Sequence, residues 1–271
     1  YPLRRQRQMC IRDRLRTREP VARDRCVVQT IRAIDDLIEM INLMSERLHE
    51  WYGLYFPELA DHSRDERYAA LISELGDRDS IKRELELEVE SVGHEMEDED
   101  IGPVRELASQ LLDLHSRKAD MESYLARVME EIAPNLKYLL TGNLAARLIS
   151  LAGGLKRLSM LPSSTVQLLG AEKAMFLHLK EQKRPPKHGI IFQHPLVHRA
   201  APWQRGKIAR SMASKISIAA RVDQWGGEFI ADHLREQMEA RAEEVRRKYP
   251  RPPRRKKPQK QRPKERKHKR G

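Results

Sequence analysis

The chain has 271 residues, of which 39% are hydrophobic, 5% aromatic and 34% charged, and its formal net charge at pH 7 is +12. The absence of a run of about 18 apolar residues excludes a membrane-spanning protein, and the low aromatic content argues against a sheet-rich enzyme with a broad core. The two cysteines cannot form a disulfide framework, and no apolar signal-peptide core occurs. We therefore expect a cytoplasmic protein of one or two domains, without a membrane partner.

The charges divide the chain into an acidic half and a basic half. Residues 1–18 carry seven arginines and one aspartate, and residues 19–133 carry 29 acidic and 13 basic side chains. Residues 134–244 carry 17 basic and 9 acidic side chains, and residues 245–271 carry 15 basic and one acidic. A basic half attracts polyanions, whereas an acidic half repels them, so we expect the two halves to have different tasks.

A helix is predicted from Val27 to Leu48, because apolar residues recur there at intervals of three and four. It is expected to end within residues 51–59, where Gly53 and Pro57 interrupt the helical pattern. The aromatic residues in and just beyond this segment predict a small packed knot. They are Trp51, Tyr52, Tyr55, Phe56 and Tyr68.

Two further helical stretches are predicted at residues 64–96, with a kink at Gly76, and at residues 104–132. At 1.5 Å per residue they would be about 50 Å and about 45 Å long, and the turn at residues 97–103 would let them pair. We interpret them as an antiparallel coiled-coil hairpin within a domain of residues 21–133. A helical bundle packed onto the rest of the chain is the alternative that the pattern leaves open.

A compact helical domain is predicted over residues 134–249, which makes the whole chain all-α. It begins with a helical stretch at residues 142–182, followed by a proline-rich loop at residues 183–206 in which residues 190–192 are strand-like. Two helices follow, at residues 206–222 and 227–248. Residues 250–271 have no apolar periodicity and are predicted to be a disordered basic tail. That tail would bind nucleic acid without sequence specificity, or serve only for solubility or localisation.

A dense group of cations points to an anion-binding surface. Ten Lys or Arg residues and a single acidic residue lie between Lys173 and Lys215. In the helix predicted from Gly206, cations and apolar residues fall on different sides. Burial of the apolar side would hold the helix in place and leave the cations exposed to solvent. Gly170 and Ala171 begin another predicted helix. The backbone amides at its start could bind phosphate, or its small residues could simply allow close packing against a neighbouring helix.

Catalytic motifs are absent from the sequence. There is no dinucleotide fingerprint, Walker loop, zinc-protease motif or nucleophile elbow, so we expect no enzyme activity and no cofactor. His188, His194 and His198 are not expected to bind a metal, because no cysteine or nearby acidic residue completes the ligand set and Pro195 disfavours a shared helical face.

Several stretches closely resemble the Nop domain. They are GNLAARLISLAGGLKRLSMLPSSTVQLLGAEKAMFLHLK at residues 142–180, PKHGIIFQHPLVH at 186–198 and WQRGKIARSMASKISIAARVD at 203–223. Residues 33–59 are similar to the helix that enters the coiled coil of this family. The WQRGKIAR block and the YPRPPRRKK sequence in the tail are most similar to the archaeal branch.

The resemblance implies a scaffold of box C/D small ribonucleoproteins, in which a guide RNA directs 2′-O-methylation of target RNA, including rRNA, by fibrillarin. It implies a homodimer formed through the coiled coil, and a Nop domain that docks on kink-turn RNA together with a small ribosomal-type protein. It also implies RNA contacts by Gly170, Ala171, Lys173, Arg184, Lys187, Gln193, Arg199, Arg205, Lys207 and Arg210. Ala171 and Glu172 would contact the small protein as well.

Residues 1–20 depart from the family pattern. They do not resemble the N-terminal domain that holds fibrillarin in this family, and we expect them to be an unassigned or foreign segment on a truncated chain. They therefore give no basis for fibrillarin binding by this chain. The alternatives are a spliceosomal-type Nop protein, a coiled-coil protein with a nonspecific tail, and an RNA-modifying enzyme, which would need strands that are almost absent here.

Overall fold

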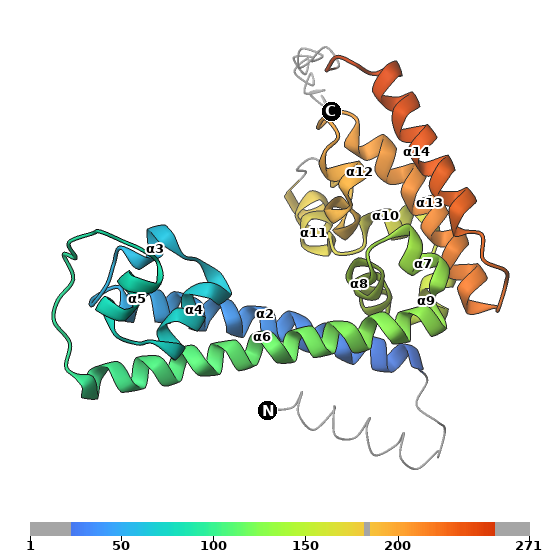
Figure 1. The fold of residues 1–271 in the computed structure, drawn as a ribbon. Coiled ribbons are helices and arrows are strands. Elements are labelled where there is room, and N and C mark those ends of the chain that lie inside the picture. Colours follow the sequence, from blue (N-terminus) through green and yellow to red (C-terminus); the bar gives the residue numbers. More distant parts are fainter. Residues whose placement is uncertain (1–22, 182–184, 253–271) are drawn as a thin grey trace, which may run out of the picture.

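The computed structural model describes residues 23–181 and 185–252, and its regular elements there are all helices (Figure 1). This confirms the predicted all-α class. Among the described helices, none has the length and apolarity needed to cross a lipid bilayer. The expectations for residues 1–20 and for the basic tail from residue 253 onward concern segments outside the described residues.

Two long helices, α2 (Arg23–Tyr52) and α6 (Asp98–Ile132), run side by side in opposite directions (Figure 1). Val27 near the start of α2 shares a core with Leu125 near the end of α6, whereas Leu48 shares a second core with Val104. At 1.5 Å per residue, their 30 and 35 residues span about 45 Å and about 52 Å, so the apolar stripes can pair along most of their length. An antiparallel hairpin is therefore present.

The arms of this hairpin differ from the prediction, because residues 64–96 do not form the long helix expected to pair with residues 104–132, and only residues 65–74 pack against α6. Residues 64–96 contain two short helices, α4 (Asp65–Glu74) and α5 (Arg78–Glu84), followed by non-helical chain. Gly76 separates the two helices with a φ of +67°, a left-handed conformation that glycine adopts without steric cost. The long helix α6 consequently pairs with α2, which offers a continuous apolar stripe.

The short helices cap the far tip of the hairpin. Together with α3 (Leu59–His62), they bury an aromatic cluster against α2 and α6. The Tyr52 hydroxyl donates to the Gly76 carbonyl oxygen at 3.0 Å, and the ring of Tyr52 meets that of Tyr68 edge-on at 6.3 Å. The predicted aromatic knot is therefore present, except that Trp51 lies outside it and is 37% exposed.

The rest of the described chain forms a second group of helices. They are α7 (Pro134–Leu139), α8 (Gly142–Ala152), α9 (Leu155–Met160), α10 (Ser163–Leu168), α11 (Glu172–Glu181), the 3₁₀ helix η1 (Ile190–Gln193), α12 (Pro195–His198), α13 (Arg205–Gln224) and α14 (Ala231–Lys248). Helix α13 lies at the centre and contacts α7, α9, α10 and α14. Its buried stripe contains several alanines, which let neighbouring helices approach closely.

Two local expectations for this part need correction. The strand-like triplet at residues 190–192 lies in the 3₁₀ helix η1, since the described chain offers it no strand to pair with and one helical turn suffices to bury Ile191. The helix expected over residues 227–248 begins only at Ala231. Gly226 adopts a φ of +69°, which ends the helical course of α13, and residues 227–230 connect the two helices without regular structure.

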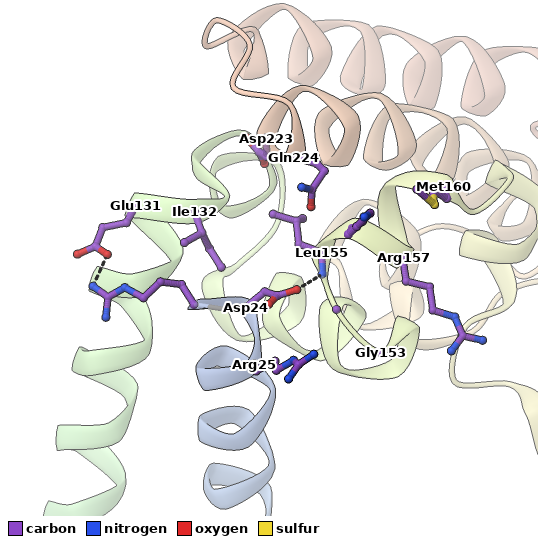
Figure 2. A pocket seen from close by; sticks show the side chains of 13 residues that line it. Asp24, Arg25, Glu131, Ile132, Gly153, Leu155, Arg157, Met160, Asp223 and Gln224 are labelled. Atoms are coloured by element: carbon purple, nitrogen blue, oxygen red, sulfur yellow. Dashed lines mark hydrogen bonds and ion pairs between the residues drawn. The ribbon is translucent and has the colours of Figure 1, made fainter. Parts of the chain in front are cut away.

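The base of the hairpin is built into this second group of helices. The Asp24 carboxylate of α2 accepts a hydrogen bond from the Leu155 backbone N–H at 3.0 Å and so caps α9. Glycine is favoured at position 154 beside it, because the backbone there has a φ of +129°, which other residues rarely adopt. A pocket of about 710 Å³ lies at this junction, with Arg25 and Arg157 among its lining residues (Figure 2). The hairpin and the helical domain are thereby held together.

Candidate RNA and protein interface

Two loops meet beside the sequence Gly-Ala-Glu-Lys that opens α11. The Gly189 N–H donates to the Gln167 carbonyl at 2.8 Å, and the Gln167 side-chain amide donates to the Lys187 carbonyl at 2.5 Å. The Ile190 N–H donates to the Leu169 carbonyl at 2.7 Å. Glycine is needed at position 189, since a Cβ there would lie 1.9 Å from a backbone oxygen. These bonds fix the proline-rich segment next to the start of α11.

The start of α11 is closed by groups of the chain itself. Gly170 has a φ of +82°, and a Cβ there would lie 3.2 Å from the Cβ of Ile190. Its N–H donates to the Glu172 carboxylate at 2.9 Å, and the Ala171 N–H donates to the carbonyl at the end of α10 at 2.9 Å. Two of the amides that were candidates for a phosphate contact therefore have partners already, and Lys173 presents an exposed positive charge beside the exposed Glu172.

Helix α11 packs weakly against the protein. None of its residues is buried, and it lies at the outer edge of the domain (Figure 1). Phe176 is 63% exposed and Leu179 is 74% exposed. Because a short helix gains most of its stability from packing an apolar face, such exposed apolar side chains mark a surface suited to a protein partner.

Five cations on and beside the first turns of α13 form a group that we call the cationic face, namely Lys187, Arg199, Arg205, Lys207 and Arg210. Lys187 joins this face from the proline-rich segment, because its side chain crosses Gly206 so closely that a Cβ there would lie 3.3 Å from the lysine Cβ. Lys187, Arg199, Lys207 and Arg210 are exposed to solvent. The structure thus brings together cations that lie up to 23 residues apart in the sequence.

Arg205 differs from the other members of the cationic face because its guanidinium is fixed by the protein. It donates to the carbonyls of Ala200 at 2.9 Å and His198 at 3.2 Å. It also lies 5.0 Å from the centre of the Phe192 ring. These contacts use several of its donors, so Arg205 orders the loop between α12 and α13 in addition to contributing charge.

Among the described residues, the sequence-predicted RNA contact Gln193 contacts a residue outside the cationic face. Gln193, at the end of η1, is exposed, and its side-chain oxygen accepts a hydrogen bond from Arg147 at 3.4 Å. Arg147 itself forms an ion pair of 2.5 Å with Asp35 on α2, and nothing in its local sequence distinguished it. Arg184 lies outside the described residues.

The histidines near the cationic face have structural contacts. The Nδ1 atom of His194 accepts from the Leu196 N–H at 3.2 Å and caps α12, and burial lowers the pKa of His194. His188 stacks on the Phe192 ring at 4.8 Å. Its pKa is lowered by burial and then by the nearby cations Arg205 and Lys187. The described residues contain no group of three side chains arranged to bind a metal.

Comparison with known proteins places these features in a family. Residues 33–244 match the family model described as Nop, snoRNA binding domain, fibrillarin. An uncharacterised NOP5 family protein of Methanocaldococcus jannaschii is 46% identical over 246 residues, which cover 85% of this chain and 59% of that protein. Nucleolar protein 58 of Schizosaccharomyces pombe is 39% identical over 215 residues, covering 74% of this chain and 42% of that protein.

A solved structure titled as a fibrillarin/NOP5P complex is also similar. Its matching chain has a TM-score of 0.55 and 27% identity, and the match covers 91% of this chain and 79% of that one. The chain spans only about half the length of the curated relatives. The cytoplasmic location predicted from the sequence is contradicted by these comparisons, because the plant and fungal relatives are named nucleolar proteins. Since the family model matches most of its residues, the chain belongs to the Nop family.

Proposed function

We propose that the chain is a non-catalytic scaffold of a box C/D ribonucleoprotein, in which it binds kink-turn RNA together with the small protein on that RNA. The observation that carries this proposal is that two features meet at η1: the exposed apolar helix α11, preceded by Gly170 packed against Ile190 of η1, and the cationic face, whose Arg205 lies over Phe192 of η1. Apolar side chains suit a protein surface, and exposed cations suit phosphates. One composite ligand would engage both.

The RNA part of the ligand would be recognised by its shape. The exposed members of the cationic face would contact backbone phosphates, together with Lys173 at the start of α11. A kinked RNA brings phosphates from two helical stems close together and displays unstacked bases, which a compact group of cations can distinguish from a straight duplex.

The protein part of the ligand would cover α11. Phe176 and Leu179 lie three residues apart and therefore share one side of the helix, where they offer the largest exposed apolar area of α11. The predicted contacts of Ala171 and Glu172 would lie at the adjoining end. The Glu172 carboxylate that now holds the Gly170 N–H would be free to turn toward the small protein when that protein binds.

Fibrillarin is the partner that we assign to methyl transfer. The family model names fibrillarin in its description, and the solved structure that this chain resembles is titled as a fibrillarin complex. The described helices would position RNA for a separate methyltransferase.

The coiled-coil hairpin is the part that we propose for homodimerisation. A groove of about 420 Å³ runs between α2 and α6, and Met40 and Met121 contribute exposed apolar surface to it. Leu43, one turn further along α2, is also exposed. Replacing Leu43 with Glu should convert a dimer into monomers in sedimentation experiments, and a monomeric unmodified chain would refute this assignment.

The test of the proposed function is a binding titration of the full chain and of a chain ending at Pro252. Both would be titrated with a straight RNA duplex and with kink-turn RNA, alone and carrying its small protein, at two salt concentrations. We expect the protein-coated kink-turn to bind at least about tenfold more tightly than the duplex to both chains, because shape recognition does not need the tail. Equal affinities for the chain ending at Pro252 would overturn the proposal.

A matched pair of charge reversals locates the contact. Lys173→Glu should weaken binding of the coated kink-turn by at least about tenfold while leaving the dimer intact, because it replaces an attraction to phosphate with a repulsion. Lys156→Glu makes the same change at an exposed position of α9 in the junction pocket and should have a small effect. Equal behaviour of the two variants would count against the site.

A further inference from the structure

The pocket at the base of the hairpin, which we call the junction pocket, has a volume of about 710 Å³ and so is large enough for a small organic ligand. Its walls come from the start of α2, the end of α6, the turn into α9 with α9 itself, and the end of α13. Helix α13 has 20 residues, so the cationic face at its start lies about 30 Å along the helix from this pocket. The junction pocket is therefore separate from the candidate RNA and protein interface.

Three cations of the junction pocket are available to a ligand. Arg25 of α2 and Lys156 and Arg157 of α9 line the pocket, and all three are exposed. Within the described chain, none of these side chains forms an ion pair or a hydrogen bond. Figure 2 shows Arg25 and Arg157 on either side of the turn at Gly153. Three unpaired positive charges around one cavity favour the binding of an anion.

The carboxylates of the junction pocket are held by neighbouring groups. Asp24 caps α9, and Asp223 accepts two backbone N–H groups at the start of α7, at 3.1 Å and 2.9 Å. Glu131 forms an ion pair of 2.5 Å with Arg23. Because each carboxylate already has a donor or a cation beside it, the charge that remains for a ligand to contact is positive.

An apolar wall completes the pocket. Ile132 and Leu155 line it together with Met160, which is 61% exposed. A methionine side chain is flexible and polarizable, so it packs well against an aromatic ring. Gln224 also lines the pocket, and within the described chain its side-chain amide makes no hydrogen bond. That amide offers a donor and an acceptor, which suits the polar edge of a nucleic-acid base.

We propose that the junction pocket binds a phosphorylated nucleoside, whose phosphate contacts Arg25, Lys156 and Arg157 and whose base packs on Met160. Guanidinium groups form paired hydrogen bonds with phosphate oxygens, and a lysine ammonium adds a point charge. A free nucleotide and an unpaired residue of an RNA strand present the same chemical unit. The inference goes beyond the proposed function, because kink-turn RNA on the cationic face would leave this pocket open.

The free nucleotide is tested by calorimetric titration of the full chain with adenosine 5′-monophosphate (AMP). We expect one AMP per chain, bound at least about tenfold more tightly than inorganic phosphate or adenosine, because each of these keeps only part of the contacts. Arg157→Glu should weaken AMP binding at least about tenfold, because it replaces a phosphate donor with a repelling charge.

Arg67→Glu is the matched control for this charge reversal. It makes the same change at an exposed position of α4 in the hairpin tip, and it should alter AMP affinity less than about 1.5-fold because distant exposed charges are screened. Both variants retain residues 253–271, so any binding of AMP by the basic tail cancels in the comparison. Urea unfolding shows whether each variant keeps its fold, and Lys156→Glu replaces Arg157→Glu if that variant unfolds.

A second variant separates the base from the phosphate. Met160→Ser should weaken AMP binding roughly threefold, because it removes part of the apolar contact with the base. It should leave the affinity for inorganic phosphate unchanged. An equal effect on both ligands would overturn the assignment of the base to this wall.

The RNA strand is tested with a fluorescent single-stranded oligonucleotide, titrated into the unmodified chain and the two charge-reversal variants. A loss of affinity for Arg157→Glu but not for Arg67→Glu, together with competition by AMP, would show that the pocket accepts a nucleotide of an RNA strand. AMP binding that depends on Arg157, without a difference between the variants on the oligonucleotide, would identify a free nucleotide as the ligand. Either result supports the inference.

Other outcomes overturn the inference. If neither AMP nor the oligonucleotide showed a dependence on Arg157, the pocket would not be a binding site. Equal measurable affinities for AMP and inorganic phosphate would show an anion site that does not recognise a nucleoside. Absence of a preference for the coated kink-turn would refute the proposed function but would leave the AMP result unaffected.

Discussion

Helices α11 and α13 both carry cations predicted to contact RNA, but the protein holds them in different ways. Helix α13 buries a stripe that includes Ile208, Met212 and Ile216, and its first turn is fixed by Arg205. Helix α11 buries none of its side chains. Helix α13 is therefore a rigid support for charges. In α11, burial of the exposed Phe176 ring can release free energy only when a partner covers it.

The largest expected effect tests this contrast in stability. Met212→Ala should lower the free energy of unfolding by about 2–5 kcal/mol, because Met212 is buried and its removal leaves a cavity in the central helix. Phe176→Ala should change it by less than about 0.5 kcal/mol, since the ring is mostly exposed. Urea unfolding measures both, and similar losses would show that α11 is packed more firmly than the exposure of Phe176 indicates.

The second effect concerns binding by α11. Phe176→Glu should weaken binding of the protein-coated kink-turn RNA by at least about tenfold, because it places a charge where an apolar protein surface is expected. Affinity for the bare RNA should change much less. Val92→Glu, at an exposed position in the hairpin tip, is the matched control. An equal loss on bare and coated RNA would mean that α11 contacts RNA alone.

The third effect concerns the charges displayed by α13. Arg210→Ala should weaken RNA binding a few-fold and reduce the slope of log K against log salt by about 1, as expected for the loss of one phosphate contact. Arg67→Ala on α4 removes an exposed positive charge from the hairpin tip instead and should leave the slope unchanged. A slope that is the same in all three proteins would remove Arg210 from the interface.

The smallest expected effect is a pH dependence of the domain that carries both helices. Burial lowers the pKa values of His188 and His194, so the folded state binds fewer protons than the unfolded state just below pH 7. Stability should therefore be fully present above the unfolded-state pKa of about 6.5 and decline as the pH falls through the unfolded-state value toward the lower folded-state values.

His194→Asn provides the control for this pH dependence. Asparagine retains a side-chain oxygen that can cap α12, but it does not titrate. Thermal unfolding between pH 7.5 and pH 5.5 should show a shallower decline for this variant than for the unmodified protein. Parallel curves would mean that His194 contributes little to the pH dependence.

In the hairpin, the periodicity of apolar residues predicted which side chains are buried but not which segments pair. Tyr68, Ile72 and Ile81 are buried, as apolar positions should be, although the long helix expected to contain them is absent. A repeating apolar stripe indicates that a surface must be covered, but it does not identify the covering segment. Helix α2 pairs with α6 along most of its length because its stripe is continuous, whereas Gly76 interrupts the competing segment, of which only α4 packs against α6.

In the candidate interface, the exposure of the cations was predictable from the sequence, whereas the hydrogen bonds of individual residues were not. Charge density alone indicated the cationic face, and Lys187, Lys207 and Arg210 are exposed as that prediction requires. The local pattern could not reveal that Arg205 binds two carbonyls, or that Glu172 folds back onto the start of α11. Those contacts depend on the exact course of the backbone in the surrounding turns.

By itself the sequence determined the all-helical class, the separation of acidic and basic halves and the resemblance to a known domain, because periodicity and charge belong to segments that can be read one at a time. Only the tertiary structure decided that α2 accompanies α6, that α11 stays uncovered and that Tyr249 returns to the start of α13. These outcomes depend on competing contacts between distant segments, and local patterns do not rank such contacts.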